Sequence, residues 1–251
     1  MLLRILLLFL AALGSLAARP AGELRVMCWN VHHGVGEDGK LDLARIAAVI
    51  RAQKPDLVAL QEVDSKCRRS SGVDQAAELA RLTGLHGAFG KAMDHEGGEY
   101  GQAILSRFPI GETRVHPLPG DGEPRIAFEA EVKVEGKMLR LITVHLDHQQ
   151  DARRLKQAET LAKALENRHG PVILAGDFND VPGSPTLTAF GLPWQAVAKR
   201  GPVFTCPAKD PKVEIDHIVL RGVEASSPAE ILPEAAASDH RPLVVTLRMT
   251  P

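Results

Sequence analysis

The chain has 251 residues, of which 45% are hydrophobic and 24% are charged, and its formal net charge is −1. This composition is ordinary for a globular protein and excludes a disordered chain. Because the chain is close to neutral, it has no general attraction for polyanions, which disfavours a broad nucleic-acid-binding surface. The length fits one large α/β domain, which we expect over residues 22–248.

The first 18 residues differ from the rest of the chain. Arg4 precedes an apolar run from Ile5 to Leu13, and small residues follow at Ser15 and Ala17. This pattern predicts a cleavable signal peptide over residues 1–18 and an exported protein, either periplasmic or extracellular. An uncleaved anchor is the alternative, but the run is short for a bilayer, which needs roughly 20 residues. We expect no stable membrane insertion and a monomer.

The three cysteines, Cys28, Cys67 and Cys206, allow at most one internal disulfide. Cys28 lies within an apolar strand pattern, where a buried free thiol is expected. Cys67 and Cys206 lie in loop-like segments that an exported protein could join, so the sequence leaves this bond open. The chain has no Cys-x-x-Cys spacing, and a structural zinc site of that type is not indicated.

Apolar runs and periodicity predict strands and helices in the first third of the chain. Asp42 and Asp74 each precede a helical pattern, and Asp42 is an expected N-cap. The elements are a strand over 24–29, a helix from Leu43 that ends before Pro55, a strand over 57–60 and a helix over 76–82.

Strands predominate after Gly84, with one long amphipathic helix over 151–168. A tight turn at Glu135-Gly136 joins two of these strands. Helices separate some strands but not others, so we expect an α/β fold in which two packed sheets are covered by helices. The expected strands cover 86–90, 100–106, 126–134, 137–145, 171–175, 214–220 and 243–247.

Polar side chains follow the apolar runs where strands are expected to end. The ends of adjacent strands converge on one rim of a sheet, so these groups should gather there. Oxygen ligands of this kind suit a hard cation such as Mg²⁺ or Mn²⁺, which would neutralise phosphate charge and hold the leaving oxygen. The groups are Asn30, Glu62, His145, Asp177 with Asn179, Asp216 with His217, and Asp239 with His240.

These residue types suit phosphate chemistry. His240, near a carboxylate such as Asp216, is a candidate general base or phosphate donor, and Asp177 is a candidate to orient water. Asn179 and His145 can donate hydrogen bonds to charge that builds on phosphoryl oxygens. Each group alone has an ordinary explanation as a turn former or a surface charge. Their joint occurrence, each at the end of an apolar run, favours a phosphoesterase.

The ordered motifs resemble those of the endonuclease/exonuclease/phosphatase superfamily, from about residue 24 to residue 247. The resemblance implies a four-layer αββα sandwich of two mixed sheets flanked by helices, the deoxyribonuclease-I-like fold. The motifs are Asn30, Leu60-Gln61-Glu62-Val63, Tyr100-Gly101-Gln102-Ala103-Ile104-Leu105-Ser106-Arg107, Thr143-Val144-His145-Leu146, Gly176-Asp177-Phe178-Asn179, Ile215-Asp216-His217-Ile218 and Ser238-Asp239-His240-Arg241-Pro242.

The resemblance also implies a divalent cation, usually Mg²⁺, with Mn²⁺ or Ca²⁺ as alternatives. Glu62 would hold it chiefly, with Asn30 and Asp239 nearby. One departure is that His32 and His33 follow Asn30, where some nucleases place an acidic second metal ligand, and this weakens a two-metal mechanism. The implied catalytic roles are water activation by Asp177, phosphate binding by Asn179 and His145, an essential imidazole on His240 supported by Asp216, and a place near the phosphate for Tyr100.

Candidate substrate contacts are Arg69, in the polar segment 68–75 after Glu62, and Arg125, Gln102 and Lys212. A solvated loop is the alternative for the charged residues. Gln102 stands where many relatives carry Asn, which weakens a phosphate contact there.

We expect an exported, Mg²⁺-dependent hydrolase of a phosphodiester or phosphomonoester in a small molecule or lipid headgroup. The alternatives are a secreted nuclease acting on DNA or RNA and a non-catalytic metal-binding module. Inactive members of such families normally lose a catalytic residue, whereas this chain retains Glu62, Asp177, Asp216, Asp239 and His240.

Overall fold

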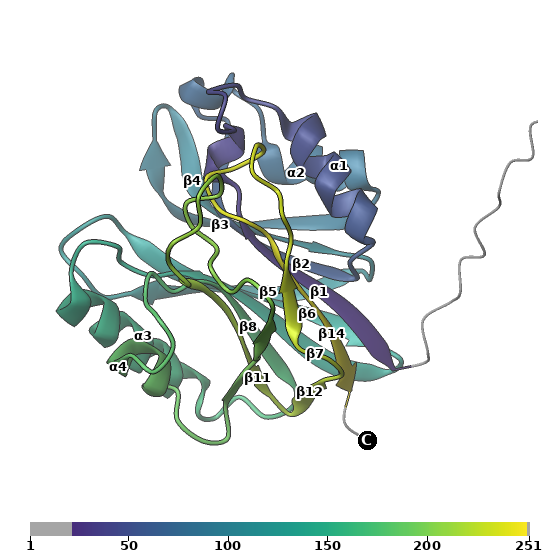
Figure 1. Ribbon diagram of the computed structural model, residues 1–251, viewed down its shortest axis with the longest axis vertical. Coiled ribbons are helices and arrows are strands. Elements are labelled where there is room, and N and C mark those ends of the chain that lie inside the picture. Colours follow the sequence, from purple (N-terminus) through teal and green to yellow (C-terminus); the bar gives the residue numbers. More distant parts are fainter. Residues whose placement is uncertain (1–21, 250–251) are drawn as a thin grey trace, which may run out of the picture.

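The structure is a computed structural model that describes residues 22–249. The signal peptide predicted over residues 1–18 lies outside these residues and stays a prediction. Two mixed β-sheets pack face to face, and helices cover the outer face of each (Figure 1). The expected α/β fold, a four-layer αββα sandwich, is confirmed. Within the described residues, no helix is long and apolar enough to cross a membrane.

The first sheet is eight-stranded and is built around β1 (Glu23–Asn30). β1 pairs in parallel with β2 (Leu57–Ser65) and antiparallel with β14 (Leu243–Met249). β4 (Gly98–Ser106) and β3 (His86–His95) continue the sheet beyond β2. Short strands complete the other side: β13 (Ala229–Ile231), β10 (Lys199–Arg200) and β12 (Val223–Ala225).

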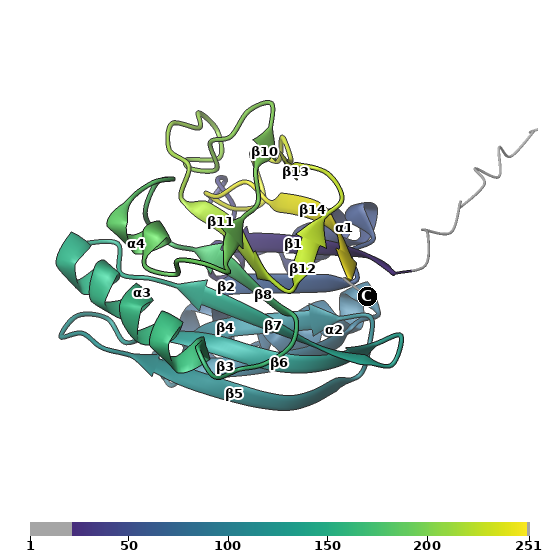
Figure 2. The ribbon, with the colours of Figure 1, turned by 90° about the horizontal axis from the view of Figure 1, so that it is seen from below.

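The second sheet is six-stranded, and the register of its strands brings three polar residues together. Figure 2 views the molecule from below, the side of Figure 1 on which this sheet lies. β7 and β8 are parallel, with His145 opposite Asp177, and β8 and β11 are antiparallel, with Asp177 opposite Asp216. These three residues therefore lie side by side at one end of the sheet. In spatial order the strands are β5 (Ile110–Leu118), β6 (Arg125–Val134), β7 (Lys137–His145), β8 (Val172–Asp177), β11 (Asp216–Arg221) and β9 (Gln195–Ala196).

Two helices cover each sheet on its outer face (Figure 1). Asp42 accepts a hydrogen bond from the backbone N–H of Arg45 at 2.9 Å, which confirms the expected N-cap, and Asp74 caps α2 in the same way. α1 (Leu43–Gln53) and α2 (Gln75–Thr83) cover the first sheet, and α3 (Asp151–Leu165) and α4 (Pro185–Thr188) cover the second. The single turns η1 (His32–Gly34) and η2 (Arg68–Ser70) follow β1 and β2.

Three apolar clusters hold the four layers together. The central cluster joins residues of the first sheet, such as Val26 and Leu57, to Phe128 and Leu141 of the second sheet. The outer clusters bury the apolar faces of α1 and α2 on one side and of α3 and α4 on the other. Burial of these faces drives the packing, since apolar area removed from water stabilises by about 25 cal/mol per Å².

The predicted elements match the structure where apolar runs are long. β5 was not expected, because most of its residues are exposed and Gly111 and Pro117 interrupt any strand pattern. The long helix was expected to residue 168 but ends at Leu165. The segments α4, β9, β10, β12 and β13 are two to four residues long, too short to leave a periodic signal.

The cysteines are free thiols, so the bond between Cys67 and Cys206 that the sequence left open is absent. Cys67 is buried, and its thiol donates to the carbonyl oxygen of Glu99 at 3.2 Å. Cys206 is half-buried and forms an isolated β-bridge with Val213. Cys28 is fully buried, as expected.

Gly176→Ala is expected to destabilise the fold, because a Cβ at this position would overlap the backbone carbonyl of Val144 on the neighbouring strand β7. We expect the free energy of unfolding to fall by about 2 kcal/mol, measured by urea denaturation. Gly111→Ala is the matched control, since a Cβ there makes only ordinary contacts. Equal stability of the two variants would contradict this account of the close strand approach.

Candidate active site

A cavity of about 400 Å³ opens at the rim where β2, β7 and β8 end, and it gathers most of the side chains predicted from the sequence. Asn30 and Asp216 lie directly behind this lining and contact it. The lining residues are Glu62, Arg69, Tyr100, Arg125, His145, Asp177, Asn179 and His240, together with His32, His33, Met93, His95, Glu123 and His148.

Glu62 reaches the cavity from a β-bulge. The pairing of β2 with β4 shifts register between Leu60 and Val63, and Glu62 adopts a left-handed backbone conformation with φ of 56°. Such a bulge turns a side chain out of the regular strand alternation. Burial would raise the pKa of Glu62, but the imidazole of His33 and the amide of Asn30 outweigh burial and hold this pKa below its usual value. The carboxylate is therefore ionised at neutral pH.

Asn30, the last residue of β1, is buried between two carboxylates. Its Nδ2 donates to Glu62 Oε1 at 3.1 Å and to Asp177 Oδ2 at 3.2 Å. Its Oδ1 accepts a hydrogen bond from the backbone N–H of His32 at 3.1 Å. The amide thus joins the predicted metal-binding carboxylate to the predicted water-activating one. Direct metal ligation by Asn30 stays a prediction.

His240 lies between two buried carboxylates. Its Nδ1 donates to Asp216 Oδ2 at 2.9 Å, and its Nε2 lies 3.7 Å from Asp177 Oδ2. The indole Nε1 of Trp29 donates to the backbone carbonyl of His240 at 2.8 Å, which fixes the main chain at this point. The ring is therefore oriented by both its side-chain and its backbone contacts.

The charges of this cluster are strongly interdependent. Burial would lower the pKa of His240, but the carboxylates of Asp216 and Asp177 raise it well above its usual value. Burial would raise the pKa of Asp216, but His240 outweighs burial and lowers it. Burial and the charge of Asp216 raise the pKa of Asp177 to about 7. Asp177 therefore exchanges its proton near neutral pH, as a general base must.

Two neutral donors flank Asp177. His145 Nε2 lies 3.6 Å from Asp177 Oδ2, and burial together with the charge of Arg125 lowers the pKa of His145 to about 3. The neutral imidazole keeps one N–H donor. Asn179 Nδ2 donates to the carbonyl of Leu146 at 3.0 Å, and its amide nitrogen carries a second hydrogen. Both side chains line the cavity.

The cavity lining also carries two guanidinium groups. Arg69 makes two hydrogen bonds to buried Asp64, at 2.8 and 2.7 Å, and its guanidinium lies 5.3 Å from the ring centroid of Tyr100. Arg125 is buried, and its Nη2 donates to His148 Nδ1 at 3.0 Å. Burial and the charge of Glu62 raise the pKa of Tyr100, so its hydroxyl keeps its proton.

Two predicted substrate contacts lie elsewhere. Gln102 is buried, and its Nε2 donates to the carbonyl of Ile126 at 2.7 Å, so it joins β4 of one sheet to β6 of the other. Lys212 is exposed and pairs with Asp210 at 3.0 Å. Neither side chain lines the cavity. The sequence could not distinguish a cross-sheet amide from a ligand contact, because both follow a strand pattern.

Asp239 also lies outside the cavity lining. It is half-buried, and its Oδ1 lies 3.2 Å from the hydroxyl of Ser238. Its backbone carbonyl accepts a hydrogen bond from Ala208 at 2.7 Å, which holds the segment that carries His240. A role for Asp239 in metal binding stays a prediction.

The sequence did not single out Lys199, whose side chain is buried and contacts Asp216 and His217. Its Nζ donates to Glu214 Oε1 at 2.6 Å, to the carbonyl of Asp216 at 2.8 Å and to His217 Nδ1 at 3.3 Å. His217 Nε2 in turn donates to the carbonyl of Asp180 at 2.8 Å. Lys199 thereby fixes the start of β11 and with it Asp216. It belongs to a two-residue strand, and no motif marks it.

A model of the Endonuclease/Exonuclease/phosphatase family matches residues 27–240. The chain belongs to the endonuclease/exonuclease/phosphatase family. The chain is 27% identical over 246 residues to the Uncharacterized protein YbhP of Escherichia coli (strain K12), covering 90% of this chain and 97% of that protein. Members of this family hydrolyse phosphoester bonds, which agrees with the side chains gathered in the cavity.

Solved structures of similar fold include an endonuclease/exonuclease/phosphatase from Beutenbergia cavernae, with a TM-score of 0.71 and 26% identity, covering 90% of this chain and 72% of that one. A mannosyl-6-phosphatase from Bacteroides thetaiotaomicron has a TM-score of 0.72 and 21% identity, covering 89% and 99%. The human Nocturnin catalytic domain with bound sulfate has a TM-score of 0.71 and 22% identity, covering 92% and 96%. The last two show that the fold is shared.

The family is typically metal-dependent, and the surroundings of Glu62 fit a divalent cation. One of its carboxylate oxygens and one ring nitrogen each of His32 and His33 lie within 4.8 Å of one another. Asp177, Asp216 and His240 form a second such group. In that group His240 Nδ1 is engaged by Asp216, and the raised pKa keeps the ring protonated, so it has no lone pair for a metal.

Stability should depend on pH through His217. Burial and the charge of Lys199 lower its pKa to about 4, below the unfolded value of about 6.5. Between these values only the unfolded chain binds the proton, so stability is fully present above about pH 6.5 and is lost as the pH falls toward 4.

We expect wild type to lose about 2 to 3 kcal/mol more than His217→Gln between pH 7 and 4.5, measured by urea denaturation. The exposed His86→Gln is the control and should follow wild type. If the free energy of unfolding falls with pH equally in wild type and His217→Gln, His217 is not held neutral in the folded protein.

Proposed function

We propose that this protein is an exported, divalent-cation-dependent hydrolase that cleaves a phosphodiester or phosphomonoester in a small molecule or lipid headgroup. The observation that carries the proposal is the position of His240 between Asp177 and Asp216, with the amide of Asn30 joining Asp177 to the ionised carboxylate of Glu62. This arrangement provides a base, a positive charge and a cation-binding group around one cavity.

Asp177 is suited to activate water. Its pKa of about 7 lets the carboxylate accept a proton as the water oxygen attacks phosphorus and the P–O ester bond breaks. The amide of Asn30 holds this carboxylate at 3.2 Å. The other carboxylate oxygen of Asp177, Oδ1, accepts a hydrogen bond from the backbone N–H of Asn179 at 2.9 Å. The carboxylate is thus fixed before the substrate enters.

Hydrogen-bond donors near the Asp177 carboxylate can stabilise the charge that builds on the phosphoryl oxygens. His240 contributes a positive charge, and neutral His145 and Asn179 contribute N–H groups. Each such preorganised donor is worth roughly 3 to 4 kcal/mol of barrier in comparable hydrolases. A cation bound at Glu62 would neutralise phosphate charge and stabilise the leaving oxygen.

The cavity supports a small substrate. Its volume of about 400 Å³ falls in the usual range for small-molecule sites. Arg69 and Arg125 supply guanidinium N–H donors at this cavity, and each is also paired with a carboxylate, Asp64 and Glu123 respectively. The whole chain has a formal net charge of −1. The mannosyl-6-phosphatase that shares this fold acts, by its name, on a phosphorylated sugar. A nuclease is the second candidate and is tested alongside.

Export rests on the N-terminal sequence pattern. Arg4, the apolar run from Ile5 to Leu13 and the small residues at Ser15 and Ala17 support cleavage after residue 17 or 18. The N-terminal sequence of protein recovered from a periplasmic or extracellular fraction tests this part of the proposal. An intact Met1 in recovered protein would contradict it.

Purified protein with Mg²⁺, Mn²⁺ or Zn²⁺ should hydrolyse members of a panel of phosphoesters. The panel contains bis(p-nitrophenyl) phosphate, p-nitrophenyl phosphate, sugar phosphates, phospholipids and plasmid DNA. We expect small esters to be cleaved faster than DNA. His240→Ala and Asp177→Asn should each lower kcat by about 10²- to 10⁴-fold, because each removes a group that acts on the reacting atoms.

His86→Ala is the control for this panel, since His86 is exposed on β3 and does not line the cavity. Faster cleavage of DNA than of every small ester would favour the nuclease. No turnover of any ester class by cation-loaded protein would refute the hydrolase proposal and favour a binding module.

Tyr100→Phe tests whether the hydroxyl in the cavity contacts the substrate phosphate. The change removes one oxygen and keeps the ring under the guanidinium of Arg69. We expect kcat/KM to fall about 10- to 100-fold, since one hydrogen bond to a charged group is worth about 1.5 to 3 kcal/mol. The thermal midpoint should stay within a few degrees of wild type. Unchanged kinetics would remove Tyr100 from the substrate contacts.

A further inference from the structure

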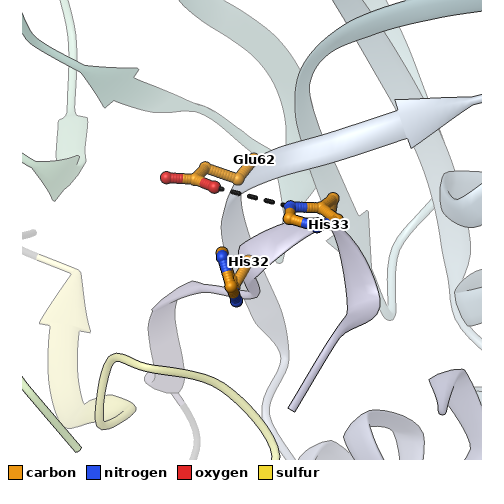
Figure 3. Close-up of side chains that lie close together, drawn as sticks. All are labelled: His32, His33 and Glu62. Atoms are coloured by element: carbon orange, nitrogen blue, oxygen red, sulfur yellow. Dashed lines mark ion pairs between the residues drawn. The ribbon is translucent and has the colours of Figure 1, made fainter. Parts of the chain in front are cut away.

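Two imidazoles lie beside Glu62, on the turn that directly follows β1 (Figure 3). We propose that His32, His33 and Glu62 form a site for a first-row transition-metal ion of the Zn²⁺ type, which this chain binds in preference to Mg²⁺. The inference rests on the proposed function, because Glu62 is the residue assigned there to the cation. The proposed ion differs from the Mg²⁺ expected from the sequence, because imidazole nitrogen ligands favour a transition metal.

The three side chains are close enough to share one ion. Figure 3 shows the His33 ring directed at the Glu62 carboxylate, with His32 on the same turn. His33 Nδ1 lies 3.9 Å from Glu62 Oε2, and the ligand atoms of all three residues lie within 4.8 Å of one another. Ligands about 2.0 to 2.2 Å from a tetrahedral zinc ion lie about 3.5 Å apart, so side-chain rotations that bring the ligand atoms about 1 Å closer complete the site.

One ring nitrogen of His32 already has a hydrogen-bond partner in the backbone. His32 Nδ1 lies 3.1 Å from the carbonyl oxygen of Val35. A carbonyl only accepts, so Nδ1 carries the proton and the lone pair of the neutral ring lies on Nε2. Metal-binding histidines usually have this support, in which one ring nitrogen donates to a carbonyl and the other binds the ion.

His33 presents an unused nitrogen toward the carboxylate. Its Nδ1 is buried from solvent and makes no hydrogen bond, and 3.9 Å is too long for one to Glu62. A buried polar atom without a partner is uncommon and costly. An ion between the two groups would satisfy both of them.

The turn that carries the imidazoles is held in place before any ion binds. His32 and His33 both have positive φ, 45° and 42°, and Glu62 does as well. The side-chain Nε2 of Gln75 donates to the carbonyl of His33 at 2.7 Å, and Gly34 N donates to Val31 O at 2.9 Å. These contacts sustain a backbone conformation that costs free energy in non-glycine residues.

The donor set decides which ion is preferred. Mg²⁺ takes oxygen ligands, whereas imidazole favours Zn²⁺, and two histidines with one glutamate leave a position open for water or substrate. In the first-row order, Zn²⁺ and Co²⁺ also bind nitrogen and oxygen sites more tightly than Mn²⁺. A site of this composition therefore discriminates against Mg²⁺.

Calorimetric titration of the metal-stripped protein with Zn²⁺ and with Mg²⁺ tests this proposal without substrate. We expect Zn²⁺ to bind at least about 100-fold more tightly than Mg²⁺. His32→Asn and His33→Asn should each weaken Zn²⁺ binding at least about tenfold and change Mg²⁺ binding by less than about threefold. Asparagine tolerates positive φ, so these variants keep the turn, and circular dichroism checks that they fold.

Co²⁺ gives a second readout, since nitrogen ligation changes its visible absorption, and the spectrum should change in both asparagine variants. His95→Ala is the control, because His95 lines the same cavity outside the cluster.

Equal Zn²⁺ and Mg²⁺ affinities, or Zn²⁺ binding that neither asparagine variant changes, would overturn the inference. Zn²⁺ preference without any hydrolysis would refute the proposed function alone. Hydrolysis supported by Mg²⁺, with no effect of either variant on Zn²⁺ binding, would refute the metal inference alone.

Discussion

Asp177 and Asp216 lie opposite one another on β8 and β11, and both buried carboxylates face the imidazole of His240. Two like charges this close and this buried are costly unless a positive group lies between them. His240 supplies that charge through a 2.9 Å hydrogen bond to Asp216. Asp177 lies farther from the imidazole of His240, at 3.7 Å, and its pKa is raised. The division of roles between the two carboxylates follows from this asymmetry.

The sandwich holds this charged cluster in place from several directions. The indole of Trp29, on β1 of the first sheet, donates to the backbone of His240, while Asp177 and Asp216 belong to the second sheet. Between the sheets, Gln61 Nε2 donates to Thr143 Oγ1 at 2.8 Å. The site therefore spans both sheets, and any change in their packing moves His240 relative to Asp177.

Much of the site could be predicted from the sequence, because polar groups at the ends of apolar strands stand out against their neighbours. Glu62, His145, Asp177 and His240 all reach the cavity. The bulge that turns Glu62 inward was not predictable, since it depends on the register with β4. Lys199 was missed because a buried lysine has no pattern of its own. Its position depends on Glu214 and the carbonyl of Asp216, which only the fold brings together.

The most direct test of the central claim is a double-mutant cycle on the cation-loaded enzyme, with kcat/KM measured for wild type, Asp216→Asn, His240→Ala and the double variant. If Asp216 acts through His240, the double variant should be no slower than His240→Ala alone. If the two losses multiply instead, the carboxylate and the imidazole act independently. In that case the arrangement of Asp177, His240 and Asp216 as one unit would be contradicted.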